Sequence, residues 1–123
     1  MTSGKLIVLA AGGTGGHVFP AEALAAELLR RGYRLALITD QRGKAYGGTL
    51  GALTTYRIRA GGLAGRGVLG LIKGGFDLVI GLFQARSLIT RLEPAAVIGF
   101  GGYAAFPTMF AARQRRIPAA LHE

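Results

Sequence analysis

The residues with the clearest chemical potential form a glycine loop, Ala11-Gly12-Gly13-Thr14-Gly15-Gly16-His17. Glycine has no Cβ, so this backbone can adopt positive φ angles and approach a ligand closely. The loop lies between the apolar run Leu6 to Ala10 and a helix expected to start near Pro20. Free N–H groups and the positive end of the helix dipole attract phosphate or another anionic oxygen. We therefore expect an anionic ligand at this loop.

His17, the last residue of the loop, has two interpretations. It can be a helix-terminal residue that is hydrogen-bonded locally. Alternatively, a helix N-terminus favours the neutral imidazole, which can accept a proton from a substrate hydroxyl or donate to a substrate oxygen. Glu123 is a second candidate for a base or an orienting group. Asp40 and Asp77 are better explained as surface or capping residues.

Two more segments with unusual composition follow predicted strands. Gly101, Gly102 and Tyr103 follow a strand expected at Ala95 to Gly99, and His122 and Glu123 follow one expected at Ile117 to Leu121. In an open parallel sheet, ligands bind beyond the carboxyl ends of the strands. We therefore expect the glycine loop and these two segments to meet at one edge of the sheet.

The composition of the 123 residues limits the partners that the chain can have. The formal net charge is +9, and twelve of the fifteen cationic residues are arginine. This charge indicates either an anionic partner, such as nucleic acid, a phospholipid surface or a diphosphate, or simply a basic solvated surface. The chain has no cysteine and two histidines without helical metal-ligand spacing, so we expect neither a metal nor a disulfide.

Strand and helix patterns alternate along the chain. The run Leu6 to Ala10 lacks alternation, as in a central parallel strand, and Ala21 to Leu29 has helical periodicity. Further strands are expected at Leu35 to Thr39 and, at the sheet edge, at Thr54 to Ile58, with a last helix from Ala104 to Arg115. The pattern predicts an α/β fold, a Rossmann-like doubly wound parallel sheet of about five strands.

The middle of the chain combines apolar and basic residues. We expect a glycine-rich region from Gly61 to Gly75 and a helix from Phe76 to Arg91. One helical stripe would join the core: Leu78, Leu82, Ala85, Ile89 and Leu92. A single sheet cannot bury a second stripe of the same helix, which favours a membrane-facing patch over a purely structural role. The residues of this predicted patch are Val68, Leu71, Ile72, Lys73, Phe76, Val79 and Phe83.

Five short motifs together resemble one enzyme family. They are GGTGGHVFPA at 12–21, GLAGRG at 62–67, QAR at 84–86, GFGGY at 99–103 and PAALHE at 118–123. In order and spacing they resemble the MurG family, the inverting peptidoglycan N-acetylglucosaminyltransferases of the GT-B class. The resemblance spans nearly the whole chain.

This resemblance implies a reaction and a cellular location. The family transfers GlcNAc from UDP-GlcNAc to the 4-hydroxyl of the muramoyl sugar of lipid I and forms lipid II in peptidoglycan synthesis. The implied location is peripheral, on the cytoplasmic face of the bacterial inner membrane, with no metal cofactor and no nucleic-acid partner.

The resemblance also implies roles for individual residues. Thr14, Gly15 and Gly16 match the family's amino-terminal contact to the donor, and His17 matches the histidine proposed to act near the acceptor hydroxyl. The second glycine loop, which helps the first to hold the acceptor diphosphate, is matched by Gly101, Gly102 and Tyr103.

Two departures from the family pattern affect these expectations. Ala104 and Ala105 stand where the family commonly has a serine, which removes a hydroxyl from the second loop. The family motif also continues past His-Glu into Gln-Asn and a second Rossmann domain. Residues 1–123 are therefore expected to be an acceptor-binding domain truncated at its carboxyl end, without the donor-binding domain and inactive alone.

Two other functions remain open at the level of the sequence. A dinucleotide-binding oxidoreductase domain could use Asp40 to hold a ribose, although its fingerprint would need a third glycine where Val18 stands. A non-catalytic membrane-anchoring subunit of a split glycosyltransferase would work with a separate donor-binding chain.

Overall fold

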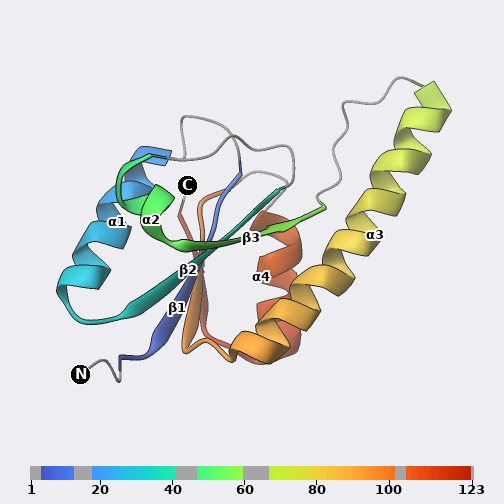
Figure 1. Cartoon of the computed structure of the whole chain (residues 1–123). Helices are drawn as coiled ribbons and strands as arrows, with labels where there is room; N and C mark the ends of the chain where they lie inside the picture. The colour runs from blue at the N-terminus through green and yellow to red at the C-terminus, as the bar shows by residue number, and fades with distance from the viewer. Residues whose placement is uncertain (1–3, 13–17, 41–46, 60–66, 102–104, 123) are drawn as a thin grey trace.

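A computed structural model shows five parallel strands in one sheet, in the order β3-β2-β1-β4-β5 (Figure 1). The structure describes residues 4–12, 18–40, 47–59, 67–101 and 105–122. The strands are β1 (Leu6–Ala10), β2 (Arg34–Asp40), β3 (Thr54–Ile58), β4 (Ala96–Gly99) and β5 (Ala119–Leu121). The predicted doubly wound α/β fold is confirmed, and β3 lies at the sheet edge as expected.

Helices cover both faces of the sheet because alternate residues of each strand point to opposite sides. Ile7 and Leu9 of β1 pack in one core with Ala21 and Ala25 of α1 (Val18–Arg30) and with Leu50 of α2 (Gly48–Ala52). The neighbouring Val8 packs in the other core, with residues of α3 (Gly67–Leu92) and α4 (Ala105–Gln114). Figure 1 shows α1 and α2 on one side of the sheet and α3 and α4 on the other.

Most predicted boundaries agree with the structure to within one or two residues. The bounds of β1 and β3 are those expected, and α1 begins at Val18 with Pro20 in its first turn, where proline is tolerated. The last strand starts at Ala119 rather than Ile117. The reason is local, because the Ile117 N–H donates to the Ala112 carbonyl at 2.9 Å and closes the end of α4.

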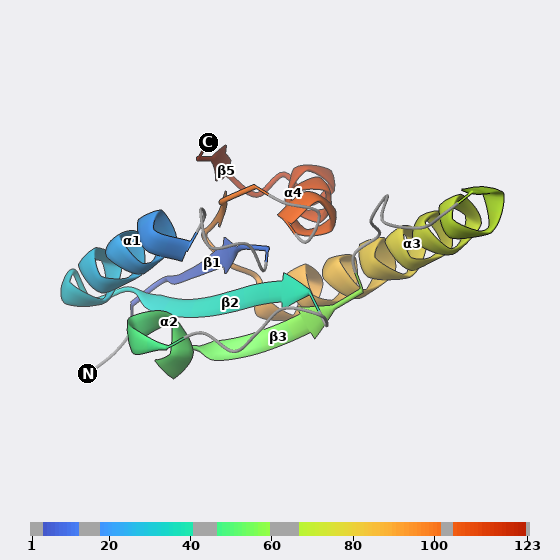
Figure 2. The same ribbon diagram turned by 90° about the horizontal axis from the view of Figure 1, so that it is seen from above.

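The predicted start of α3 at Phe76 is wrong. The helix begins at Gly67 and runs for 26 residues, through a segment that was expected to be a glycine-rich loop. Its second half packs on the sheet through buried Ala85, Leu88 and Ile89, of which Leu88 was not predicted. Its first half extends beyond the sheet (Figures 1 and 2). By length and composition alone, α3 could cross a membrane, with a mean hydropathy of 1.5 and 11% of the apolar window buried.

Candidate functional site

Three strands end side by side at the carboxyl edge of the sheet. Ala10 of β1 pairs with Gly99 of β4, which in turn pairs with Leu121 of β5. Beyond the strands, the Phe100 N–H donates to the Ala10 carbonyl at 2.9 Å and the His122 N–H to the Gly99 carbonyl at 2.8 Å. The segments that leave these strands therefore start together, as the parallel sheet predicts.

Most of the predicted ligand-binding residues lie outside the part of the chain that the structure describes. They are Thr14, Gly15, Gly16, His17, Gly102, Tyr103 and Glu123, and the roles assigned to them stay predictions. Gly101 is described and has a φ of 86°, in the region that glycine adopts without steric cost. The second loop therefore begins with a turn that requires glycine.

A buried aromatic residue follows β4 and lies next to His122. Phe100 is 2% exposed, and its ring centroid lies 5.8 Å from that of His122. Across the described ranges, no three His, Cys, Asp or Glu side chains gather in a group that could hold a metal ion. The described part of this edge therefore offers backbone groups and an imidazole.

The end of β2 contributes two buried polar atoms, one from Asp40, which was expected at the surface or in a cap, and one from Thr39, which the sequence did not single out. Thr39 Oγ1 and Asp40 Oδ1 are buried and have no hydrogen-bond partner among the residues that the structure describes. They adjoin the start of the glycine loop, because the Ala11 N–H donates to the Ile38 carbonyl at 3.1 Å. In the sequence, Thr39 is an ordinary β-branched strand residue, and nothing indicates that its hydroxyl would be buried without a partner.

A contact between β3 and α3 explains the Gln84 of the QAR motif. The Arg59 N–H, just beyond β3, donates to Gln84 Oε1 at 2.7 Å. At Gly81 a Cβ would lie 1.8 Å from the Arg59 carbonyl oxygen, so only glycine allows this approach. The Arg59 guanidinium also lies 3.8 Å from the Asp77 carboxylate. These contacts fix α3 at the point where the segment 60–66 leaves the sheet.

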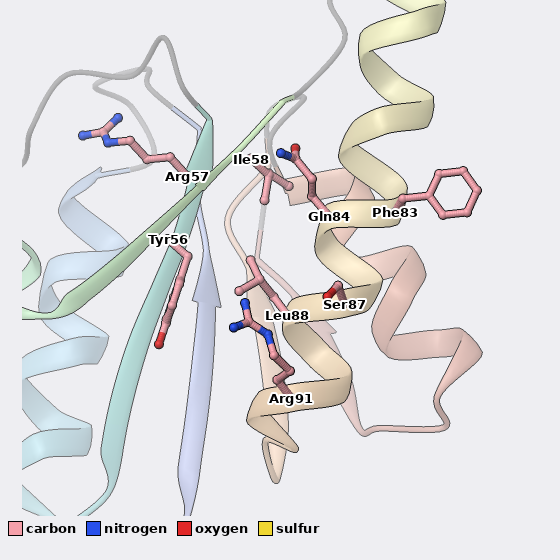
Figure 3. A pocket seen from close by; sticks show the side chains of 8 residues that line it. All are labelled: Tyr56, Arg57, Ile58, Phe83, Gln84, Ser87, Leu88 and Arg91. Atoms are coloured by element: carbon pink, nitrogen blue, oxygen red, sulfur yellow. The ribbon is translucent and has the colours of Figure 1, made fainter.

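A groove of about 470 Å³ runs between β3 and α3. Figure 3 shows Gln84 and Leu88 pointing from α3 toward β3, whereas Phe83 points away from the strand. Phe83 is the only residue of the predicted site among the residues that line this groove. The groove is therefore separate from the carboxyl edge, and the outward direction of Phe83 places it on a different surface.

That surface is an apolar stripe on the outer face of α3. Its members are spaced by three or four residues and are 50–72% exposed: Val68, Ile72, Phe76, Val79 and Phe83. From Val68 to Phe83 the helix rises fifteen times by 1.5 Å, so the stripe is about 22 Å long. Leu71 and Lys73, the other members of the predicted patch, are exposed as well. Contiguous exposed apolar surface on this scale is typical of an interaction site.

Comparison with known proteins gives consistent matches. Residues 7–123 match the glycosyltransferase family 28 N-terminal domain. The chain is 66% identical, over 99% of its length, to the UDP-N-acetylglucosamine–N-acetylmuramyl-(pentapeptide) pyrophosphoryl-undecaprenol N-acetylglucosamine transferase of Paramagnetospirillum magneticum, and covers 33% of that protein. The enzyme of the same name from Rhodopseudomonas palustris is 50% identical over the whole chain, which covers 34% of it. The chain thus spans about a third of the length of these relatives.

Two solved structures superpose on the chain. MurG of Acinetobacter baumannii superposes with a TM-score of 0.79 at 34% identity, over 97% of this chain and 35% of that one. The calicheamicin glycosyltransferase CalG4 superposes with a TM-score of 0.66 at 17% identity, over 97% of this chain and 32% of that one, which is a likeness of fold alone.

Proposed function

Since the chain belongs to glycosyltransferase family 28 and forms its N-terminal domain, we propose that it is the acceptor-binding half of a peptidoglycan N-acetylglucosaminyltransferase. The parent enzyme would transfer GlcNAc from UDP-GlcNAc to lipid I and form lipid II. The observation that carries the proposal is the 66% identity to an enzyme of that name along nearly the entire chain. Because that relative is three times longer, transfer would require a further, donor-binding part.

The proposed chemistry is a direct displacement. The 4-hydroxyl oxygen of the muramoyl sugar forms a bond to C1 of GlcNAc as the bond between C1 and the UDP phosphate breaks. A base takes the hydroxyl proton, and His17 is our candidate. Backbone N–H groups of the two glycine loops, Thr14 to Gly16 and Gly101 to Tyr103, would hold the diphosphates. The alignment of β1, β4 and β5 at one edge supports this arrangement.

A chimera tests the proposed activity. Residues 1–123 would replace the matching part of the Paramagnetospirillum magneticum relative, and transfer of labelled GlcNAc to lipid I would be measured. We expect activity in the chimera and none in the isolated chain. His17→Ala should reduce kcat at least 100-fold, because general-base catalysis contributes about 10²–10⁴. Glu93→Gln, at the opposite edge of the sheet, is the control. A folded chimera that binds NAD tightly and transfers no sugar would favour the oxidoreductase alternative.

We further propose that the outer stripe of α3 lies on an anionic membrane surface. The stripe is apolar and exposed, Lys73 and Arg86 flank it, and the chain carries a net charge of +9. A surface position fits better than a membrane-spanning one, because Ala85, Leu88 and Ile89 of the same helix belong to the domain core. Spanning the bilayer would pull these side chains out of that core.

Co-sedimentation with phosphatidylglycerol vesicles tests the membrane contact. Ile72→Ser and Phe76→Ser should each lower the partition coefficient about tenfold or more, because each removes a side chain worth about 1.5–3 kcal/mol on burial. The control is Leu29→Ser, which changes a 42% exposed leucine on α1, across the sheet. Equal losses in all three variants, or no binding by the unaltered chain at low salt, would contradict the membrane proposal.

A further inference from the structure

The exposed face of α3 carries a spacing that the membrane proposal does not explain. Five apolar side chains recur at intervals of three, four, three and four residues, and they are 50–82% exposed: Leu69, Ile72, Phe76, Val79 and Phe83. Four of them also belong to the outer stripe. None of the five is part of either core of the described domain. Alternating intervals of three and four are the heptad spacing with which one helix packs along another.

The borders of these five residues, which we call the α3 seam, allow a second helix to approach. The next heptad position is Arg86, which donates to Gln114 Oε1 of α4 at 3.4 Å and ends the apolar run. The heptad positions on either side of the seam carry one charge, that of Lys73, and are otherwise small, apolar or uncharged: Val68, Gly75, Ile80, Leu82 and Ser87. A partner helix would therefore meet a single cation along the seam.

We propose that, in the absence of a membrane, the α3 seam pairs with the α3 seam of a second copy of this chain. In such a twofold contact the same surface is used on both copies, so the two seams match in length and in apolar character. The two helices would run antiparallel. Only the second half of α3 packs on the sheet (Figure 2), so antiparallel pairing places the two domains at opposite ends of the helix pair. Each copy carries a net charge of +9, and this separation minimises their repulsion.

Lys73 selects the register of the pair. One antiparallel heptad register joins Phe76 to Val79 of the other copy and Ile72 to Phe83 of the other copy. In this register the two Lys73 side chains are about 13 Å apart along the helix axis. The other register joins Ile72 to Phe76 of the other copy and brings the two lysines within about 3 Å along the axis, which their like charges disfavour. We therefore expect the twofold axis to lie between Phe76 and Val79.

The size of the interface indicates a weak, reversible pair. An exposed side chain of this kind removes on the order of 100 Å² from water, so five from each copy would bury about 1,000 Å² in total. This area is near the lower limit for a specific interface, and the pair should dissociate on dilution. The bilayer proposed above would compete for the same side chains. The pairing stands without the membrane part of the proposed function, whereas the competition rests on it.

Sedimentation velocity without lipid tests the pairing. The unaltered chain should shift from monomer to dimer as its concentration rises, and salt should increase the dimer fraction because it screens the repulsion between two copies of charge +9. Salt should weaken vesicle binding instead. Phe76→Ser should lower the association constant about tenfold or more, because each dimer loses two buried phenyl groups. Leu29→Ser, on α1 across the sheet, is the control and should leave the constant unchanged. Equal losses in both variants would overturn the inference.

Single cysteines test the antiparallel arrangement, since the chain has no cysteine of its own. Phe76 is next to the proposed axis, so a short bismaleimide should join Phe76→Cys to its counterpart. Leu69→Cys is the matched control on the same seam, because its two copies would be about 25 Å apart along the axis. Equal cross-linking at both positions would indicate parallel helices, and cross-linking at neither would indicate that the seams do not meet. Either result would overturn the inference.

The pairing and the membrane contact can fail separately. A chain that stays monomeric at every concentration and salt level but binds vesicles would overturn the pairing and leave the membrane proposal standing. A chain that dimerises through the seam but does not bind vesicles would do the reverse.

The cross-linking is repeated in a cysteine-free form of the chimera, because the chain spans about a third of the length of its relatives. Phe76→Cys should again be cross-linked and Leu69→Cys should not. Cross-linking of Phe76→Cys in the isolated chain alone would mean that the remaining part of the parent covers the α3 seam, and would overturn the inference.

Discussion

Gly101 and Gly75 have opposite effects on the stability of the elements that contain them. Gly101 has a φ of 86°, in a region that an L-residue enters at a cost of about 1–2 kcal/mol. Gly75 lies inside α3 with ordinary helical backbone and open space where a Cβ would be. One glycine is required by the turn that starts the second loop, whereas the other weakens its helix.

The two glycines should therefore respond to alanine with opposite signs. Gly101→Ala should lower the free energy of unfolding by about 1–2 kcal/mol, because alanine must adopt the strained backbone. Gly75→Ala should raise it by as much as about 1 kcal/mol, because glycine is a poor helix former. Urea unfolding followed by circular dichroism measures both. A stabilising Gly101→Ala would contradict the positive φ and the turn that depends on it.

At the scale of elements, the five-residue helix α2 depends on a side chain from α1. Its own N-cap residue, Gly47, provides no side-chain hydrogen bond. Instead, the Glu22 carboxylate accepts the backbone N–H groups of Thr49 at 2.6 Å and Leu50 at 3.0 Å. These two bonds, Leu50 first, lower the pKa of Glu22 below its ordinary value of 4.5. The carboxylate thus joins two elements that are 27 residues apart.

Glu22→Gln tests this capping contact. Glutamine can accept only one of the two N–H groups well, so the free energy of unfolding at pH 7 should fall by about 1 kcal/mol, as for a lost helix cap. Because the folded-state pKa is lowered, the stabilisation is present above pH 4.5 and is lost as the pH falls through the folded-state value. The difference between the unaltered chain and the variant should therefore disappear in acid. Glu93→Gln, which changes an exposed carboxylate after α3, is the control. A difference independent of pH would argue against an ionised cap.

The sequence predicted the strands better than the longest helix, for a physical reason. Runs such as Leu6 to Ala10 are specified by local composition, and parallel strands must end at the same edge. The start of α3 was missed because four glycines between 67 and 75 lower helix propensity, and the apolar residues among them have no core to face.

The contacts that complete the site depend on tertiary placement. The bond from Arg59 to Gln84 joins residues 25 positions apart, and the close approach at Gly81 follows from how α3 crosses β3. Neither has a local signature in the sequence. The sequence also gives no sign that the Thr39 hydroxyl is buried, because burial is a property of the assembled sheet edge.

At the scale of the whole molecule, the two halves of α3 differ in how they pack on the described part of the domain. Its second half belongs to the core through Ala85, Leu88 and Ile89, whereas its first half extends beyond the sheet with exposed apolar side chains (Figure 2). Glycines within that first half each cost about 1 kcal/mol relative to alanine. We therefore expect the local stability of this segment to depend on the membrane surface proposed above.

Hydrogen exchange measured by mass spectrometry should detect this dependence. In water, amides of residues 68–78 should exchange faster than those of residues 84–92, because local opening of the first half exposes no core. On phosphatidylglycerol vesicles, protection of residues 68–78 should increase about tenfold or more, since the bilayer would bury the apolar stripe and favour the helix. Amides of α1, on the other face of the sheet, should be unchanged. Two outcomes would mean that a surface other than the α3 stripe meets the membrane. One is an equal gain of protection in α1. The other is no change in residues 68–78 under conditions where the chain sediments with the vesicles.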